Sequence, residues 1–191
     1  MGVIGRPAPL WSGAAAQKGE EIKLKSEDFK GSWYVLFFYP LDFTFVCPTE
    51  IVAYDNLHEK FEAAGAKVIG CSVDSVHTHL AYMRTSRTEA GVGALKFPLL
   101  SDLGKNIAAA FDVLHPDGLK ALRATFIVDP DGVIQSATIN NLSIGRNTAE
   151  TLRTLKAAQQ ARELGDVCPA DWEEGDELMK ATLAGVAKTI N

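Results

Sequence analysis

The chain has 191 residues, of which 47% are hydrophobic and 23% are charged, and its formal net charge is -5. This length can bury the core of one ordinary domain, and the negative charge disfavours a nucleic-acid partner, which needs a field of Lys and Arg. The longest apolar run, Trp33 to Tyr39, is too short to span a bilayer. Residues 1–6 lack the hydrophobic core of an export signal. We therefore expect a cytoplasmic protein with neither a nucleic acid nor a membrane as its partner.

Alternating apolar runs and helical patterns predict an α/β fold. The run Trp33 to Tyr39 is typical of a strand buried on both faces, and the turn over residues 129–132 joins the two strands of an expected hairpin. The strands are expected over residues 33–39, 68–73, 124–129 and 133–139, and the helices over residues 49–64, 75–87, 105–112 and 147–164. The last of these helices begins with a capping-box pattern, Asn147 followed by Glu150.

The helical pattern of the sequence ends at Gly165. An irregular stretch follows, then a cluster of acidic residues, and a short helix is expected around residues 178–190. We therefore expect one domain over residues 1–165 and a C-terminal arm over residues 166–191.

Three cysteines are too few, and odd in number, for a secreted disulfide scaffold. No two of them have a C-x-x-C spacing, and the only close histidine pair, His77 and His79, has a spacing that suits a strand better than a helix. We therefore expect no metal site and no cofactor, which leaves the chemistry of thiols as the function to consider. The missing C-x-x-C pair also disfavours a thioredoxin-like disulfide reductase, and no histidine lies in a motif that would indicate a cysteine hydrolase.

Cys47 lies between a predicted strand and a predicted helix, and it is followed by Pro48, which suits a first helical turn. A thiol at a helix N-terminus is favoured as thiolate, and the thiolate is the nucleophile. Cysteine is equally a small buried hydrophobic residue. The local pattern alone therefore leaves both interpretations open.

The wider pattern, Pro40-x-x-x-Thr44-x-x-Cys47 within Phe-Thr-Phe-Val-Cys-Pro-Thr-Glu at 43–50, resembles the active-site motif of peroxiredoxins. Residues 123–129, Gly145-Arg146 and residues 166–170 resemble further motifs of that family, in the same order along nearly the whole chain. The resemblance is closest to the typical two-cysteine class, which includes the bacterial alkyl hydroperoxide reductase peroxidase subunit. It implies a thioredoxin-like fold with an N-terminal extension and a C-terminal arm.

The resemblance also implies a role for each matched residue. Cys47 attacks the peroxide and becomes a sulfenic acid, while Arg123 supplies a fixed cation beside it. Thr44 places its hydroxyl against the sulfur and the peroxide, and Pro40 excludes water. From the residues alone, a surface salt bridge for the arginine and a helix cap for the threonine are the simpler interpretations.

Glu50 and Arg146 are expected to form a charged network that orients Arg123. Cys168 lies 121 positions after Cys47, in the irregular arm, and is expected to resolve the sulfenic acid as a disulfide. In the resembled class this thiol comes from the other subunit of a homodimer, although spacing alone does not distinguish that from attack within one chain. Cys71 is expected to be a core residue.

The family implies hydrogen peroxide and organic hydroperoxides as substrates, and a thioredoxin or a flavoprotein disulfide reductase as electron donor. It further implies dimers that assemble into a ring, expected to be a decamer, with Phe45, Thr78 and Tyr82 near the contact between dimers. A holdase-type chaperone is the non-enzymatic alternative.

Some relatives carry a Gly-Gly-Leu-Gly insert and a C-terminal Tyr-Phe motif that restrain the arm. Here residues 90–93 read Ala-Gly-Val-Gly and the tail has no Tyr-Phe. We therefore expect the arm to open readily.

Overall fold

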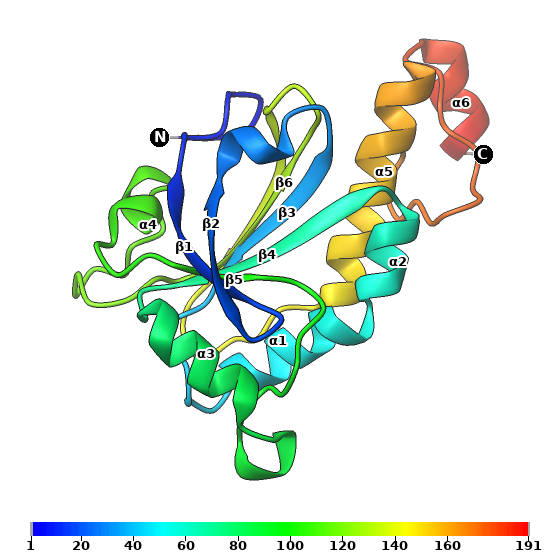
Figure 1. Ribbon diagram of the computed structural model, residues 1–191. Helices are drawn as coiled ribbons and strands as arrows, with labels where there is room; N and C mark the ends of the chain where they lie inside the picture. Colours follow the sequence, from blue (N-terminus) through cyan, green and yellow to red (C-terminus); the bar gives the residue numbers. More distant parts are fainter. Residues whose placement is uncertain (1, 191) are drawn as a thin grey trace. The chain divides into compact units, whose positions relative to one another are not determined.

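The computed structural model describes residues 2–190 and divides them into two compact units, with the boundary between Thr148 and Ala149. The first unit contains a seven-stranded mixed sheet in the order β2-β1-β5-β4-β3-β6-β7 (Figure 1). The three central strands β5, β4 and β3 are parallel, and the outer pairs are antiparallel. The strands are β1 Ser12–Gln17, β2 Glu20–Lys25, β3 Trp33–Phe38, β4 Ala66–Ser72, β5 Leu99–Ser101, β6 Arg123–Val128 and β7 Ile134–Asn140.

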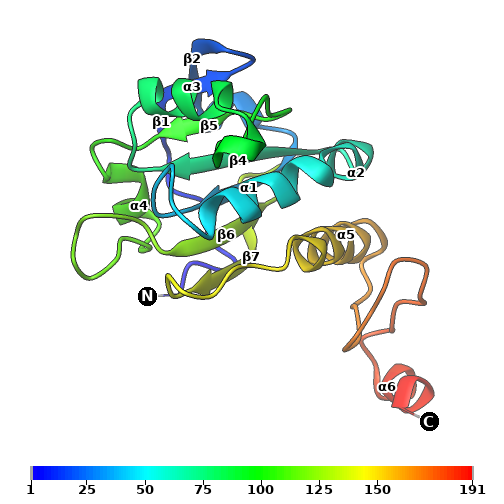
Figure 2. The ribbon, with the colours of Figure 1, turned by 90° about the horizontal axis from the view of Figure 1, so that it is seen from below.

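Helices cover both faces of this sheet, because the side chains of the central strand β3 alternate between two apolar layers. Phe37 stacks on Tyr54 of α1 with 4.2 Å between ring centroids, whereas Phe38 contacts Phe111, which follows α4, at 5.4 Å. Figure 2 shows the same helices from below. The helices are α1 Cys47–Asn56, α2 His58–Ala63, α3 Val76–Arg84 and α4 Asn106–Ala110, with short 3-10 turns at Ser26–Phe29 and Arg87–Glu89.

The α/β class is confirmed, and the four predicted strands correspond to β3, β4, β6 and β7. The helix predicted over residues 49–64 is two helices, because the chain leaves helical geometry at Leu57. His77 and His79 lie on helix α3, so the strand interpretation of their spacing is wrong. Strands β1, β2 and β5 were not predicted.

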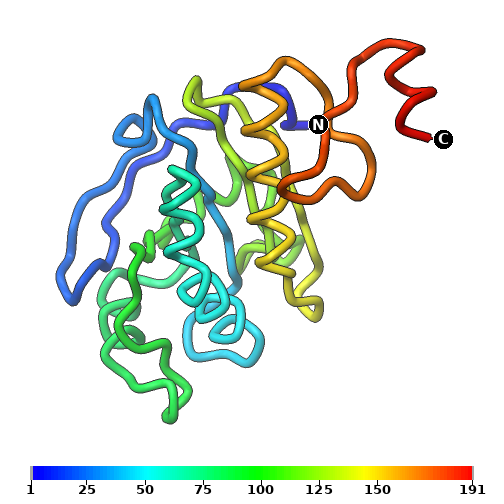
Figure 3. The backbone as a smooth tube through the Cα atoms, turned by 90° about the vertical axis from the view of Figure 1, so that its right-hand side faces the viewer, coloured from blue at the N-terminus to red at the C-terminus, as the bar shows by residue number. Residues whose placement is uncertain are grey.

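The second unit contains helix α5 (Thr148–Leu164) except for its first residue, an irregular loop, and α6 Leu183–Ile190. The loop returns alongside α5 before it reaches α6 (Figure 3). Helix α5 begins within one residue of the predicted start, whereas α6 begins later than residue 178, where a helix was expected. The proposed division at residues 165 and 166 falls inside this unit and stays a prediction.

Within residues 2–190, no helix is both long and apolar enough to cross a membrane. The same part of the chain holds no cluster of three metal-ligating side chains.

Candidate active site

The structure places Cys47 in the first turn of α1, immediately after the loop that follows β3. Pro48 is in the same turn, where its missing N–H costs nothing, and the side chain of Cys47 is completely buried. The N-terminus of a helix carries partial positive charge from its unpaired N–H groups. The sulfur therefore lies where an anion is stabilised.

Arg123 supplies a full positive charge beside that sulfur. It is the first residue of β6, which pairs with β3 so that Ala124 is opposite Phe38, and this register brings its side chain to the end of β3. Its Nη1 lies 3.4 Å from Sγ of Cys47 and 2.8 Å from a carboxylate oxygen of Glu50. Its Nε donates to the carbonyl of Leu142 at 2.6 Å, so the guanidinium is held at both ends.

Glu50 lies between two arginines. Both the backbone N–H and Nε of Arg146 donate to Glu50 Oε1 at 2.8 Å, and Arg146 Nη2 donates to Oε2 at 2.9 Å. Burial raises the pKa of Glu50, but the hydrogen bonds and charges of Arg146 and then Arg123 outweigh it, so the net pKa is lowered. Two guanidinium charges and one carboxylate leave a net charge of +1, which a Cys47 thiolate would neutralise.

The loop over residues 39–46 precedes Cys47 and carries Pro40 and Thr44. Pro40 is buried, and Thr44 is half-buried with its hydroxyl donating to the carbonyl of Leu41 at 2.9 Å. The hydroxyl oxygen of Thr44 keeps its acceptor capacity in this arrangement. The structure thus places Thr44 in the loop before Cys47, with its donor bond directed to the backbone.

Sequence analysis missed the residues that fix this loop in place. Nδ1 of His79 lies 2.7 Å from one carboxylate oxygen of Asp42, and the hydroxyl of Tyr39 donates to the other at 2.7 Å. Burial raises the pKa of Asp42, while the hydrogen bond to His79 opposes that rise. Asp42 and His79 are 37 positions apart and lie on different elements, so no local pattern could have joined them.

The residues expected at a contact between dimers lie on the loop and on α3. Phe45 is 94% exposed, whereas Phe43 is 48% exposed and its ring centroid lies 4.5 Å from that of Tyr82. The hydroxyl of Thr78 pairs with that of Ser75 at the start of α3. The first unit therefore presents a large aromatic side chain to solvent two residues before Cys47.

The other two cysteines differ from Cys47 and from each other. Cys71 is completely buried in the core of the sheet, as expected, and burial raises its pKa well above the ordinary value. Cys168 is partly exposed in the second unit, and its thiol donates to the carbonyl of Ala157 at 3.3 Å. All three are free thiols.

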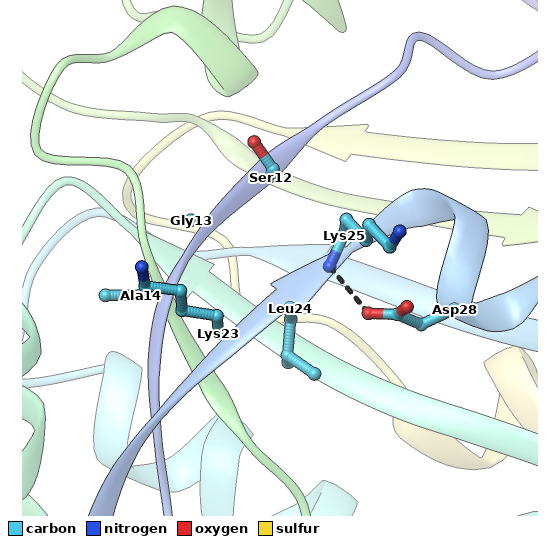
Figure 4. A pocket seen from close by; sticks show the side chains of 7 residues that line it. All are labelled: Ser12, Gly13, Ala14, Lys23, Leu24, Lys25 and Asp28. Atoms are coloured by element: carbon cyan, nitrogen blue, oxygen red, sulfur yellow. Dashed lines mark hydrogen bonds between the residues drawn. The ribbon is translucent and has the colours of Figure 1, made fainter.

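A cavity of about 480 Å³ lies on the hairpin of β1 and β2 (Figure 4). Asp28 accepts a hydrogen bond there from the backbone of Lys25 at 3.0 Å. The residues that line it are Ser12, Gly13, Ala14, Lys23, Leu24, Lys25 and Asp28, none of which belongs to the cluster around Cys47.

A thioredoxin-like sheet that presents a buried cysteine at a helix start, beside a fixed guanidinium, defines a thiol-based redox enzyme. The model of the AhpC/TSA family matches residues 4–137, and that of the C-terminal domain of 1-Cys peroxiredoxin matches residues 157–190.

Similar proteins support the same assignment. The chain is 51% identical to the chloroplastic 2-Cys peroxiredoxin BAS1 of Hordeum vulgare, over 96% of this chain and 88% of the relative. It is 44% identical to peroxiredoxin-4 of Dictyostelium discoideum, over 95% of this chain and 70% of that protein. The reduced 2-Cys peroxiredoxin of Plasmodium vivax superposes with a TM-score of 0.96 at 40% identity, over 100% of this chain and 99% of the other.

AhpC of Enterococcus faecalis superposes with a TM-score of 0.83 at 38% identity, over 88% of this chain and 100% of the other. The chain belongs to the AhpC/TSA family and is a typical 2-Cys peroxiredoxin. Its activity is that of a thiol-dependent peroxidase.

Proposed function

We propose that Cys47 is the cysteine that attacks peroxide. Its thiolate attacks the terminal oxygen, so that an S–O bond forms while the O–O bond breaks. Water or an alcohol leaves after taking a proton, and the sulfur is oxidised to sulfenic acid while the peroxide is reduced. Hydrogen peroxide and organic hydroperoxides are both substrates of this reaction.

The single observation that carries this assignment is the guanidinium of Arg123, 3.4 Å from the sulfur and locked by Glu50 and Leu142. A fixed cation in a buried site stabilises the thiolate before reaction and the negative charge that develops on the departing oxygen. Arg146 completes the cluster by holding Glu50 through three hydrogen bonds. Thr44 and Pro40 line the same loop and are proposed to position the peroxide and to exclude water.

We further propose that Cys168 resolves the sulfenic acid. Its sulfur attacks the sulfur of Cys47, an S–S bond forms, the S–O bond breaks, and water leaves. The resulting disulfide joins Cys47 of one subunit to Cys168 of its partner. A thioredoxin, or a flavoprotein disulfide reductase, then returns both thiols to the reduced state.

The exposed ring of Phe45 supports assembly beyond the dimer, because an isolated aromatic side chain in water gains free energy when a second surface covers it. We propose a ring of dimers, a decamer, with Phe45 and Thr78 at the contact and Tyr82 near it, buried and packed against Phe43. We also propose a cytoplasmic location, since three cysteines are too few for the disulfide framework of a secreted scaffold. Cell fractionation tests the location.

The test of the activity is peroxide consumption by the purified protein, coupled in turn to each candidate reductant with NAD(P)H oxidation as the readout. We expect turnover with one of the two reductant systems and none with Cys47→Ser. A Cys71→Ser variant is the matched control and should retain the wild-type rate. Full activity of Cys47→Ser would overturn the assignment.

A further inference from the structure

The segment around Cys168 is a closed loop. The backbone N–H of Val167 donates to the carbonyl of Met179 at 3.0 Å, and the N–H of Met179 donates back to Val167 at 2.9 Å. An ion pair of 2.7 Å between Lys180 and Asp166 lies next to this bridge. We call residues 167–179 the resolving loop, and Figure 3 shows it beside α5.

Cys168 is the first residue after the bridge, and its sulfur is directed at helix α5. The thiol donates to the carbonyl of Ala157, and partial burial raises its pKa, although the charge of Arg153 opposes that rise. In this arrangement Cys168 is a protonated hydrogen-bond donor. It is not the free thiolate that attacks a sulfenic acid.

Arg153 holds the opposite side of the loop. Its Nη1 donates to the carbonyl of Trp172 at 2.6 Å, while Nε and Nη2 donate to the carboxylate of Glu150 at 2.7 and 2.8 Å. Arg153 and Ala157 are four residues apart on α5, and Glu150 is three residues before Arg153, so all three share one face of the helix. The side chain that anchors Trp172 therefore lies one turn from the carbonyl that holds Cys168.

The anchored end of the loop is itself ordered. Trp172 is 3% exposed, and its indole N–H donates to the carbonyl of Asp176 at 3.1 Å. Lys156, also on α5, pairs with Glu174. The planar fork of Arg153 can bond a carboxylate and a carbonyl at once, whereas the single ammonium of a lysine has no such fork.

We propose that Arg153 is a positioning residue for the resolving step, which holds the resolving loop closed on α5 and thereby keeps the Cys168 thiol bonded to the carbonyl of Ala157 until the loop opens. The proposal rests on the proposed role of Cys168 and deepens it. Opening breaks the bonds to Trp172 and Ala157, after which the released thiol loses its proton and attacks the sulfenic sulfur. The disulfide forms and water leaves, so the step needs no reactant beyond those of the established activity.

The opening can be measured without any peroxide chemistry. In a Cys47→Ser background, the rate at which iodoacetamide alkylates Cys168 reports how often the loop is open, because Cys71 is buried. We expect Arg153→Ala to raise that rate about tenfold, the change that follows when one partly exposed, charge-assisted hydrogen bond no longer opposes opening. Arg153→Lys keeps the positive charge but cannot bond Glu150 and Trp172 at once, so it should raise the alkylation rate of Cys168 nearly as far.

The control is Lys188→Ala, which removes a cation that pairs with Glu177 of the resolving loop at 2.8 Å but, unlike Arg153, does not bond the loop to α5. The rate at which Cys168 is alkylated in this variant should stay within about twofold of the rate in Cys47→Ser alone, as expected when an exposed ion pair is removed. An unchanged or lower rate in both Arg153 variants would overturn the proposal.

The same variants in the wild-type background test the reaction by rapid mixing with peroxide. The sulfenic-acid step should be unchanged in Arg153→Ala, while disulfide formation should be about tenfold faster. A general structural defect would instead slow both steps. If wild-type protein formed no disulfide at Cys168 while the alkylation result was as expected, the proposed resolving role of Cys168 would be wrong. The proposal that Arg153 holds the resolving loop closed would still be supported.

Discussion

At the scale of single residues, Cys47 and Cys71 differ in the charge that surrounds the sulfur. Arg123 and Arg146 face the single carboxylate of Glu50, and the remaining positive charge lies against the sulfur. Cys71 has no such partner; it lies among apolar side chains, and the charge of Asp102 adds to the burial that raises its pKa. The thiolate form is therefore disfavoured at Cys71, whereas a fixed positive charge lies beside the sulfur of Cys47, as the proposed role of Cys47 requires.

Replacing Arg123 with alanine should lower the rate constant for the reaction of Cys47 with peroxide. The loss of a hydrogen bond to a charged partner is worth about 1.5–3 kcal/mol, which corresponds to about a 10- to 100-fold slower reaction. Rapid-mixing measurement of sulfenic-acid formation checks this. A rate constant within about twofold of wild type would mean that the guanidinium is not needed at the transition state.

Glu50 links the stability of the site to pH. Its pKa is lower in the folded protein than the ordinary value of 4.5, so it contributes stability that is fully present above about pH 4.5 and is lost as the pH falls through the folded pKa. Glu50→Gln should therefore be destabilised by about 3–5 kcal/mol near neutral pH, because it leaves two buried guanidinium groups without their carboxylate.

The difference in the free energy of unfolding between wild type and Glu50→Gln should shrink as the pH falls below about 4.5. Urea unfolding of both proteins at a series of pH values measures it. A difference that stays constant from pH 7 into the acid range would show that the carboxylate charge is not what stabilises the cluster.

The resemblance led to most of this cluster, because Glu50 lies in the matched motif around Cys47 and Arg123 begins the matched motif over residues 123–129. The sequence could not show that Arg146 also bonds the carbonyls of Phe38 and Ala124, since those contacts depend on how the sheet places distant backbone groups. Contacts of this kind follow from the tertiary fold.

At the scale of elements, three of the four predicted strands have apolar runs, and the fourth, β7, was predicted from the turn that precedes it. β3 and β4 lie in the middle of the sheet and are buried on both faces, which leaves a clear hydrophobic signal. β1 is rich in Ala and β5 has only three residues, so neither has a clear strand pattern. β2 alternates Ile22 and Leu24 with lysines, but over too few residues to stand out from its charged surroundings. Pairing with neighbours, rather than local preference, makes these segments strands.

The C-terminal arm has more order than its composition indicated. Two features hold the resolving loop: the bridge between Val167 and Met179, and the hydrogen bond from Arg153 to Trp172. These are a few partly exposed hydrogen bonds and not a packed core. Bonds of that kind open at low cost.

We therefore expect disulfide formation to outrun a second attack by peroxide, so that activity survives many turnovers at high peroxide. Mass spectrometry of Cys47 after cycling at millimolar-scale peroxide measures the sulfinic form. Cys168→Ser should accumulate it rapidly, and wild type should not. Equal accumulation in the two proteins would show that the arm does not open readily.

At the scale of the whole molecule, the proposed ring of dimers places the exposed side chain of Phe45 at the contact between dimers. If Phe45 packs against another dimer, ring formation stabilises the loop that carries Thr44 and precedes Cys47. Phe45→Ala should weaken the association of dimers, since burying a Phe side chain contributes about 1.5–3 kcal/mol. Sedimentation velocity of the reduced proteins checks this, and an unchanged ring in the variant would place the contact elsewhere.

Oxidation should also loosen the ring, because the disulfide needs the loop to leave its reduced arrangement. Sedimentation of reduced and oxidised wild-type protein should give a smaller species after oxidation. If the reduced and oxidised proteins sedimented as the same species, the conformation of the loop before Cys47 would not affect ring assembly.

The most direct test of the central claim uses two variants that are each inactive in disulfide formation. Cys47→Ser and Cys168→Ser are mixed, allowed to exchange subunits under reducing conditions, freed of reductant and treated with one equivalent of peroxide. Non-reducing electrophoresis and peptide mass spectrometry should show a covalent dimer in the mixture, joined between Cys47 of one chain and Cys168 of the other, and none in either variant alone. A mixture that stays monomeric, while wild-type protein still turns over, would contradict the account.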